Sequence, residues 1–315
     1  MKFSHTEEKR EEQHLDVLTD EENGVRIIVS RLGAELVSLA RINEEGEWVG
    51  FLYRDNDIST PSQGWANHAT VMGYYLHRLK NGRSLYRGRE IKGGNHGFLR
   101  SKTWHLTNQT LEGSGASLEY RITPNDFSAE EYPLKVSVTL TYRIDTNKIG
   151  VLFEFRNEEP DLDAHVSFGL HPGFAATSFD SFHLQMPGGL YRRHFSPGNF
   201  LSGETRDIEF AGGEMPFSKT ELPSSVILEL LDVPRRQFSY VDPPSGRWVI
   251  LDLTGVPYLT LWSDGAPFLC VEPCWGLTDH QEQRSFEHKE GIQTITPGGT
   301  LRASFSMSPE LASSD

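Results

Sequence analysis

Hydrophobic and polar residues alternate along much of this chain. From Leu134 to Tyr142 every even-numbered residue is apolar or aromatic and every odd-numbered residue is polar. This period of two is that of a β-strand with one buried face. A turn at Asp145–Lys148 and a second alternating run from Ile149 to Phe155 predict that the two runs form an antiparallel hairpin.

Similar short runs recur along the chain, and we expect each to form a strand. Glycine and proline, 29 and 17 residues respectively, fall mostly between the runs, and no stretch shows helical periodicity with caps at both ends. The pattern predicts an all-β fold with little helix, a large antiparallel β-sandwich. The runs are Val25–Val29, Ala34–Ile42, Trp48–Tyr53, Ser117–Ile122, Val226–Leu231, Trp248–Leu253, Tyr258–Trp262, Phe268–Glu272 and Leu301–Met307.

The chain has no interior linker and no repeat of fixed period. We therefore expect residues 1–315 to form one domain, with a core over about 25–308. The polar first 20 residues and the tail Ser308–Asp315 are expected to be frayed ends.

Composition narrows the range of partners and compartments. A formal charge of −14 argues against nucleic acid or an anionic membrane as the main partner. No apolar run approaches the roughly 20 residues of a membrane-spanning helix, and the charged first residues do not resemble a secretory signal. Cys270 and Cys274 lie too far apart in an extended chain for a disulfide. Two reduced thiols fit a cytoplasmic protein.

His171 is the first candidate for chemistry. It ends the run 165–171, in which His165, Ser167 and Gly169 share its face, and the small residues leave room for a ligand on the sheet. The alternative is a solvated strand face.

Glu272 is the second candidate, because it closes the apolar run that begins at Phe268. Burial would raise the pKa of this carboxyl and make it a better general base, whereas an ordinary glutamate would pair with an arginine or face water. Both His171 and Glu272 precede a proline, which should hold each residue extended at a strand end. An imidazole opposite a carboxylate can exchange protons near neutral pH.

The scarce basic residues cluster in two segments, His77–Arg83 and Gly93–Arg100. Their donors suit the oxygens of a sugar, although a solvated loop paired with acidic neighbours is the alternative. The chain contains no Walker loop, no Gly-x-Ser-x-Gly elbow and no His-Glu-x-x-His zinc helix, which argues against phosphoryl transfer and serine hydrolysis.

At four segments in the same order, the chain resembles the aldose 1-epimerase (galactose mutarotase-like) family. The segment from Arg78 to Ile91 is similar to the family's Gly-Arg-x-x-Asn-Gly stretch and the strand pair after it, and His96–Arg100 to its His-Gly-Phe-Ala-Arg signature. His171–Phe174 is similar to His-Pro-Tyr-Phe, and Glu272–Gly276 to Glu-Pro-Trp-x-Gly.

The resemblance implies a β-supersandwich fold and mutarotase activity on a small-molecule sugar, with no cofactor and no metal. It places the general base on Glu272, the general acid on His171 and the sugar-holding groups on Arg78 and His96. Arg100 and Trp275, from the same motifs, are also expected to contact the sugar. We expect a monomer or homodimer.

Three positions depart from the motifs beside the expected ligand. His77 stands where the family usually has glycine, Gly173 replaces the tyrosine, and Cys274 displaces Trp275 by one position. These departures bear on which sugar is bound. The family's additional acidic sugar ligand has three candidates here, Asp232, Asp242 and Asp252.

Other functions fit parts of the pattern. The substrate could be a hexose 6-phosphate, held by Arg78, Lys80, Arg83 and Arg100, or the chain could be a noncatalytic carbohydrate-binding module on the same fold. A β-sandwich glycosidase or lyase would need a second carboxylate opposite Glu272.

Overall fold

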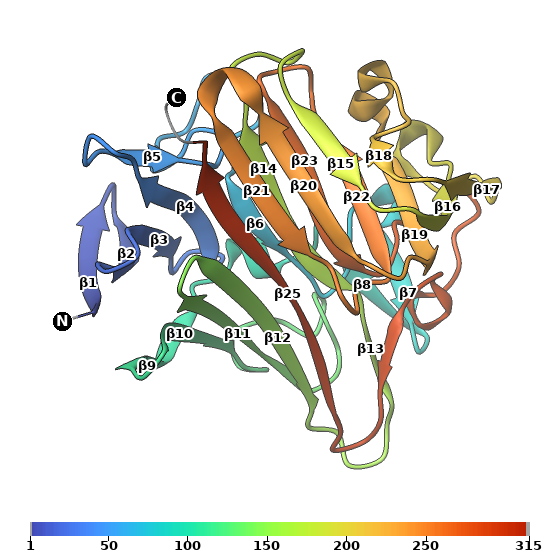
Figure 1. Cartoon of the computed structure of the whole chain (residues 1–315). Coiled ribbons are helices and arrows are strands. Elements are labelled where there is room, and N and C mark those ends of the chain that lie inside the picture. Colours follow the sequence, from blue (N-terminus) through green and yellow to red (C-terminus); the bar gives the residue numbers. More distant parts are fainter. Residues whose placement is uncertain (1, 313–315) are drawn as a thin grey trace.

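The computed structural model describes residues 2–312, and it is built almost wholly from antiparallel strands (Figure 1). The helical elements among these residues are short 3-10 turns: η1 (Lys80–Gly82), η2 (Leu99–Ser101), η3 (Pro197–Asn199), η4 (Lys219–Ser224), η5 (Pro243–Ser245) and η6 (Phe286–His288). The predicted all-β class is therefore confirmed. No helix in this part of the chain has the length and apolar character needed to cross a membrane.

Three large sheets and two strand pairs make up the fold. In spatial order, the nine-stranded sheet contains β18 (Gly213–Glu214), β15 (His183–Met186), β20 (Gln237–Asp242), β21 (Arg247–Asp252), β25 (Thr300–Leu311), β12 (Lys148–Asn157), β11 (Val136–Asp145), β10 (Gly115–Ile122) and β9 (His105–Glu112). The seven-stranded sheet contains β17 (Thr205–Phe210), β16 (Gly189–His194), β19 (Val226–Asp232), β22 (Tyr258–Trp262), β23 (Phe268–Trp275), β14 (Phe168–Ala175) and β6 (Ala69–Met72).

The remaining strands lie at the margins of the molecule. The five-stranded sheet contains β1 (Phe3–Arg10), β2 (Gln13–Asp20), β3 (Val25–Ser30), β4 (Glu35–Ile42) and β5 (Trp48–Gly50). The pairs are β7 (Arg83–Tyr86) with β8 (Arg89–Lys92), and β13 (Ala164–Val166) with β24 (Gln293–Ile295).

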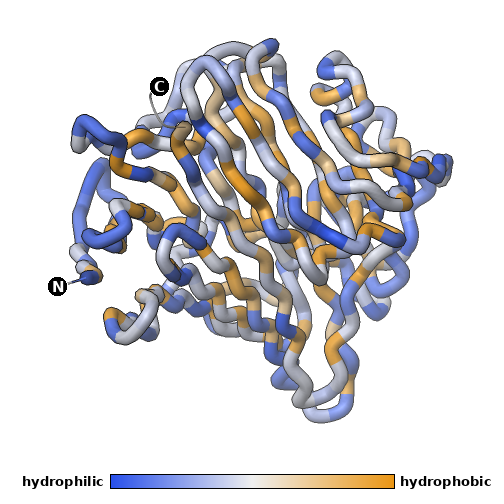
Figure 2. The backbone as a smooth tube through the Cα atoms, in the orientation of Figure 1, coloured by the Kyte–Doolittle hydropathy of each residue, from blue (hydrophilic) through white to orange (hydrophobic). Residues whose placement is uncertain are grey.

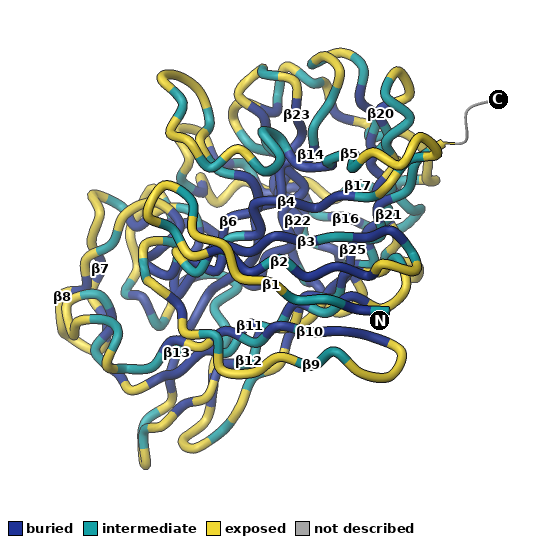
Figure 3. Tube along the Cα trace, turned by 90° about the vertical axis from the view of Figure 1, so that its left-hand side faces the viewer, coloured by how far each residue is buried: buried dark blue, intermediate teal, exposed yellow. Residues whose placement is uncertain are grey.

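The nine-stranded and seven-stranded sheets pack face to face through apolar side chains. The ring of Phe168 on β14 lies 4.4 Å from that of Phe155 and 5.2 Å from that of Phe153, both on β12. Hydrophobic and polar positions alternate along the strands of the nine-stranded sheet, which lies in front in Figure 2. The buried residues gather in the middle of the molecule and the exposed ones in its turns (Figure 3). Strands β6, β14 and β23 of the seven-stranded sheet are buried along nearly their whole length, so this sheet is covered on both faces.

The predicted hairpin and the predicted runs are confirmed as strands. Strands β11 and β12 pair as an antiparallel hairpin in which Leu140 faces Phe153. Each of the other predicted runs overlaps a strand of the structure.

The prediction of frayed ends is wrong. The first 20 residues include β1 and β2, which pair with each other over their whole length, and β2 pairs with β3. At the other end, Ser308–Leu311 belong to β25 and pair with β21; residues 313–315 lie outside the described part of the chain.

The run 165–171 is not one strand, as its alternation suggested. The chain passes from β13 to β14 at Ser167, whose hydroxyl accepts a hydrogen bond from the Leu76 amide (3.0 Å). His165 therefore lies in a different sheet from His171, with its Nδ1 3.1 Å from the Tyr86 hydroxyl.

Candidate active site

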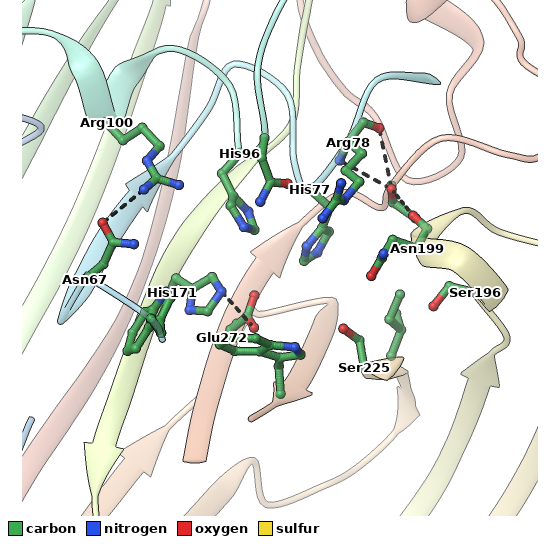
Figure 4. A pocket seen from close by; sticks show the side chains of 15 residues that line it. Asn67, His77, Arg78, His96, Arg100, His171, Ser196, Asn199, Ser225 and Glu272 are labelled. Carbon is green, nitrogen blue, oxygen red and sulfur yellow. Dashed lines mark hydrogen bonds and ion pairs between the residues drawn. The ribbon is translucent and has the colours of Figure 1, made fainter. Parts of the chain in front are cut away.

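His171 and Glu272 lie side by side at the centre of the seven-stranded sheet. Strands β14 and β23 pair antiparallel, with Gly169 opposite Cys274 and Gly173 opposite Cys270, which places His171 opposite Glu272. The distance from His171 Nε2 to Glu272 Oε1 is 3.3 Å. Both residues are buried, with 4% and 1% of their surfaces exposed. The pair faces a pocket (Figure 4).

The two prolines do not end the strands, as the sequence suggested. Pairing continues on both sides of Pro172 and Pro273, so His171 and Glu272 lie in the middle of β14 and β23. A proline has no amide hydrogen, and it keeps the residue before it extended. The prolines therefore interrupt the hydrogen bonds between the strands where the two side chains meet.

Burial shifts the protonation of both groups toward their neutral forms. It lowers the pKa of His171 to about 3, with smaller contributions from the charges of His77 and Arg100. It raises the pKa of Glu272 well above its usual value. Both shifts favour the form in which Glu272 carries a proton and His171 is neutral. The charged form, with Glu272 ionised and His171 protonated, has the same number of protons and differs by one transfer across the 3.3 Å contact.

Two more histidines reach the pocket from connecting segments. The ring of His96 lies 5.0 Å from that of His171 and 5.5 Å from that of His77. Burial lowers the pKa of His96 well below its usual value and that of His77 to about 4. All three rings are therefore neutral at neutral pH, able to accept one hydrogen bond and donate another.

Backbone hydrogen bonds hold the segment that carries His96 next to the segment that carries His77. The amide of His96 donates to the carbonyl of His77 (2.6 Å), and that of Gly73 donates to His96 (3.0 Å). Gly97 has a φ of +75°, and a Cβ built there would lie 2.1 Å from the Gly73 carbonyl oxygen. Only glycine fits, which explains why a glycine follows His96.

Of the four basic residues that were candidates for holding a phosphate, two line the pocket and two do not. Arg78 and Arg100 line it, and Arg100 donates to the side chain of Asn67 (2.9 Å). Lys80 instead donates to the carbonyl of Gln281, and Arg83 is exposed and pairs with Glu90. A ligand in the pocket therefore meets two arginines.

Trp275 does not lie in the pocket, which corrects its assignment as a sugar contact. Side chains alternate along β23, so Trp275 lies on the face opposite Glu272. Its ring stacks on Phe168 in the core, with centroids 5.2 Å apart. Cys274, one residue earlier, lies on the same face as Glu272.

None of the three aspartate candidates lines the pocket. Asp242 is buried in hydrogen bonds with Thr177, Ser181 and Ser245, and Asp252 caps the turn at Thr254. Asp232 lies beside Gly188 and Gly189 in a different depression. Among the residues described as lining the pocket, Glu272 carries the only carboxylate.

Several pocket residues were not identified from the sequence. Trp65 stacks on His171, with ring centroids 5.2 Å apart, and its ring lies 6.0 Å from that of Trp262. Trp65 is a lone aromatic residue in a segment rich in serine, proline and glycine, and that was the available signal. Asn67, Asn95, Ser196, Asn199, Ser225, Ile227 and Thr278 also line the pocket without such a signal.

The pocket is a cavity of about 310 Å³. It is lined by the two tryptophans, the three histidines, the two arginines and Glu272, among others. This volume is at the lower end for small-ligand sites, which begin at about 300 Å³. Aromatic walls beside polar donors suit a compact molecule with both apolar faces and hydroxyl groups. With one carboxylate among its described lining residues, the pocket does not supply the two that most glycosidases use.

Comparison with known proteins gives a family and a fold. The model of the family described as aldose 1-epimerase matches residues 16–203. No curated protein matches the chain significantly.

Solved structures resemble the whole chain at low identity. A galactose mutarotase related enzyme from Lactobacillus acidophilus superposes with a TM-score of 0.80 at 22% identity, over 99% of each chain. A galactose mutarotase-like protein from Lactobacillus casei gives 0.77 at 20% identity, over 98% of this chain and 100% of that one. A galactose 1-epimerase from Lactobacillus acidophilus gives 0.72 at 13% identity, over 99% of each. At these identities the likeness shows the fold.

Proposed function

The chain belongs to the aldose 1-epimerase family, and on this premise we propose that it interconverts the α and β anomers of a hexose. The observation that carries the proposal is the buried pair of His171 and Glu272, 3.3 Å apart on neighbouring strands and facing a pocket of sugar size. An imidazole and a carboxylate in contact can give a proton to one oxygen of a ligand and take a proton from another.

The proposed reaction needs only proton transfers. Glu272, in its ionised form, removes the proton from the C1 hydroxyl while protonated His171 gives its proton to the ring oxygen. The bond between C1 and the ring oxygen then breaks, and C1 becomes an aldehyde. After rotation about the C1–C2 bond, the reverse transfers close the ring on the other face. Each positioned group contributes on the order of 10² to 10⁴ in rate.

The other pocket residues are proposed to orient the sugar. Arg78 and His96 donate to its hydroxyl groups and stabilise charge that develops on its oxygens. The rings of Trp65 and Trp262 offer apolar surfaces to the C–H faces of the pyranose. Trp65 also packs on His171, so it holds the imidazole in place.

Polarimetry on freshly dissolved α-glucose and α-galactose tests the proposal. The protein should speed the approach to anomeric equilibrium, and Glu272→Gln should lower kcat by at least about 10²-fold while sparing much of the sugar binding. Glu154→Gln is the matched control, because Glu154 lies outside the pocket and pairs with Arg302. Sugar binding by the unaltered protein without faster equilibration would favour a noncatalytic carbohydrate-binding module.

A hexose 6-phosphate is the second candidate substrate. Arg78 and Arg100 both line a pocket that contains one carboxylate, and arginine binds phosphate through paired hydrogen bonds. Competition between glucose or galactose and their 6-phosphates distinguishes the two. If the phosphates leave the kinetics of the free sugars unaltered, the phosphate reading fails.

A further inference from the structure

We propose that the same pocket binds a divalent transition-metal ion such as Zn²⁺ through His77, Glu272 and Cys274, and that the bound ion inhibits the enzyme. The inhibition rests on the proposed epimerase function, whereas the binding does not. A nitrogen, an oxygen and a sulfur ligand from these residues form a set that zinc prefers.

The three side chains already lie close to binding distance. One ligand atom from each can be chosen so that all three lie within 4.8 Å of one another, and Cys274 Sγ lies 4.0 Å from His77 Nε2. Bonds of about 2.0 to 2.3 Å in a tetrahedral zinc site imply ligand atoms about 3.3 to 3.8 Å apart. Movements of about 1 Å or less by the side chains would therefore complete the site.

Two parts of the chain supply these ligands. Glu272 and Cys274 are two residues apart on β23, so both side chains point to the pocket face of the sheet. His77 comes from the segment after β6, and Figure 4 shows its ring above Glu272. Hydrogen bonds hold this segment on both sides, since the Leu76 amide donates to the Ser167 hydroxyl and the His96 amide donates to the His77 carbonyl. The fold thus fixes the backbone positions that carry the three ligands, and the side chains make the remaining adjustment.

His77 and Cys274 are two of the three positions that depart from the family motifs. His77 has a φ of 52°, in the left-handed region where glycine is unstrained. A side chain kept in such a conformation at a functional site often has a role of its own. Here the two departures supply the nitrogen and the sulfur that a soft metal ion needs.

Glu272 also offers an unused oxygen. Its Oε2 is buried and has no hydrogen-bond partner among residues 2–312, whereas Oε1 lies beside His171. A buried carboxylate oxygen without a donor is costly, and a cation would satisfy it. The unpartnered oxygen therefore supports a bound cation independently of the spacing of the three side chains.

Metal binding would prevent the proposed chemistry. Coordination of Glu272 occupies the carboxylate that removes the C1 proton, and the Cys274 thiol loses its own proton to solvent when it binds the ion as a thiolate. Three protein ligands leave a fourth position, which water or a sugar hydroxyl can take.

Cobalt provides a direct test of binding that does not depend on turnover. Metal-free protein titrated with Co²⁺ should bind one ion with a thiolate-to-cobalt charge-transfer band, and Zn²⁺ should abolish the band. Cys274→Ser and His77→Gly should each remove the band or weaken cobalt binding at least about 10-fold. Loss of a residue that only hydrogen-bonds to a metal ligand already lowers metal affinity by about that factor. Cys270→Ser is the matched control, because Cys270 is the other buried thiol of β23 and is outside the cluster; it should keep the band.

The unaltered protein gives a second measurement if a variant does not fold. X-ray absorption of the zinc-loaded protein should show one sulfur at about 2.3 Å with nitrogen or oxygen neighbours at about 2.0 Å. A shell of nitrogen and oxygen alone, or cobalt binding that survives both Cys274→Ser and His77→Gly, would overturn the site.

Activity with and without metal then tests the inhibition. Zn²⁺ should slow mutarotation by the unaltered protein and by Cys270→Ser in proportion to occupancy, and much higher concentrations should be needed for Cys274→Ser. A loaded protein as active as the metal-free one would overturn the inhibition. If mutarotation is not detected in any sample, the epimerase proposal fails while the cobalt titration still decides the metal site.

Discussion

At the scale of single residues, Trp65 and Gly173 form a matched pair. The indole of Trp65 lies against Gly173 on β14, where a Cβ would come within 2.3 Å of the ring. Gly173 does not have a positive φ, so its backbone would accept another residue. The glycine is needed because the tryptophan takes the space that a side chain on β14 would otherwise fill.

Gly173→Ala should therefore push Trp65 away from His171. We expect overpacking to cost about 1–3 kcal/mol of the free energy of unfolding and kcat/KM to fall at least about 10-fold as the imidazole loses its support. Urea unfolding and polarimetry measure the two effects. Combining Gly173→Ala with Trp65→Ala should recover most of the lost stability; purely additive losses would contradict the pairing of the two residues.

The sequence predicted which candidate residues lie together better than it predicted the residues around them. His171, Glu272, Arg78, His96 and Arg100 all line the pocket. They carry ionisable or charged groups in short distinctive motifs, which is why they could be recognised. Trp65 and the polar residues around it come from connecting segments whose path depends on tertiary packing, so no local pattern predicts where they point.

At the scale of elements, the alternation along β23 separates a face that carries the candidate base from a face that packs in the core. Glu272 lines the pocket and Cys274 lies on the same face of β23, whereas Val271 and Trp275 belong to the core. Trp275 was expected to contact the sugar because the motif was matched by residue type alone. The match did not take into account which face of the strand the residue occupies. A shift of one position, from Trp275 to Cys274, exchanges the two environments.

Trp275→Ala should accordingly affect folding and not sugar recognition. Removing a buried indole that stacks on Phe168 should cost about 3–5 kcal/mol of the free energy of unfolding. KM should stay within about twofold of its value in the unaltered protein. Urea denaturation and initial-rate polarimetry on the folded variant provide the comparison, and a large rise in KM with unchanged stability would return Trp275 to the pocket.

The N-terminal hairpin of β1 and β2 was missed because β1 is polar on most of its length. Its anchor is Asp16 on β2, which is buried and accepts hydrogen bonds from Arg31 and from the Tyr120 hydroxyl on β10. Burial alone would raise the pKa of Asp16, but hydrogen bonds from Arg31, His5 and Tyr120 lower it below its usual value. A buried carboxylate bound to residues from later in the chain thus holds together strands that local polarity suggested were frayed.

Asp16→Asn should destabilise the protein by about 3 kcal/mol at neutral pH, because it removes one partner of a buried ion pair. The folded pKa lies below the unfolded value of 3.8, so the stabilisation is complete above about pH 5 and is lost as the pH falls through 3.8 and below. The difference in stability between the two proteins should therefore narrow from pH 5 to pH 3. Thermal melts across this range measure it, and a constant difference would exclude the carboxylate as the cause.

At the scale of the whole molecule, one hydrophobic cluster connects all three large sheets. It includes Leu18 of the five-stranded sheet, Phe153 of the nine-stranded sheet and Phe168 of the seven-stranded sheet. Tyr142 of β11 also donates to the carbonyl of Ala34 (2.9 Å), and Arg41 of β4 binds Glu310 of β25. The period-two pattern predicted the class of fold, but the order of strands in these sheets depends on contacts between distant segments that no local pattern contains.

The single-domain organisation expected from the sequence stays a prediction that unfolding can test. Because the cluster spans the sheets, we expect one cooperative transition in guanidinium chloride, with tryptophan fluorescence and far-ultraviolet circular dichroism giving the same midpoint. Two separated midpoints would indicate parts that unfold independently.

The position of His171 and Glu272 in the middle of paired strands has a consequence for how such proteins diversify. His171 and Glu272 are strand residues, whereas Trp65, Arg78, His96 and Asn199 come from turns and short connections. Exchanging those connections between relatives should change which carbohydrate is accepted without altering what is done to it. The sheet would then determine the reaction, and the connecting segments would determine the substrate.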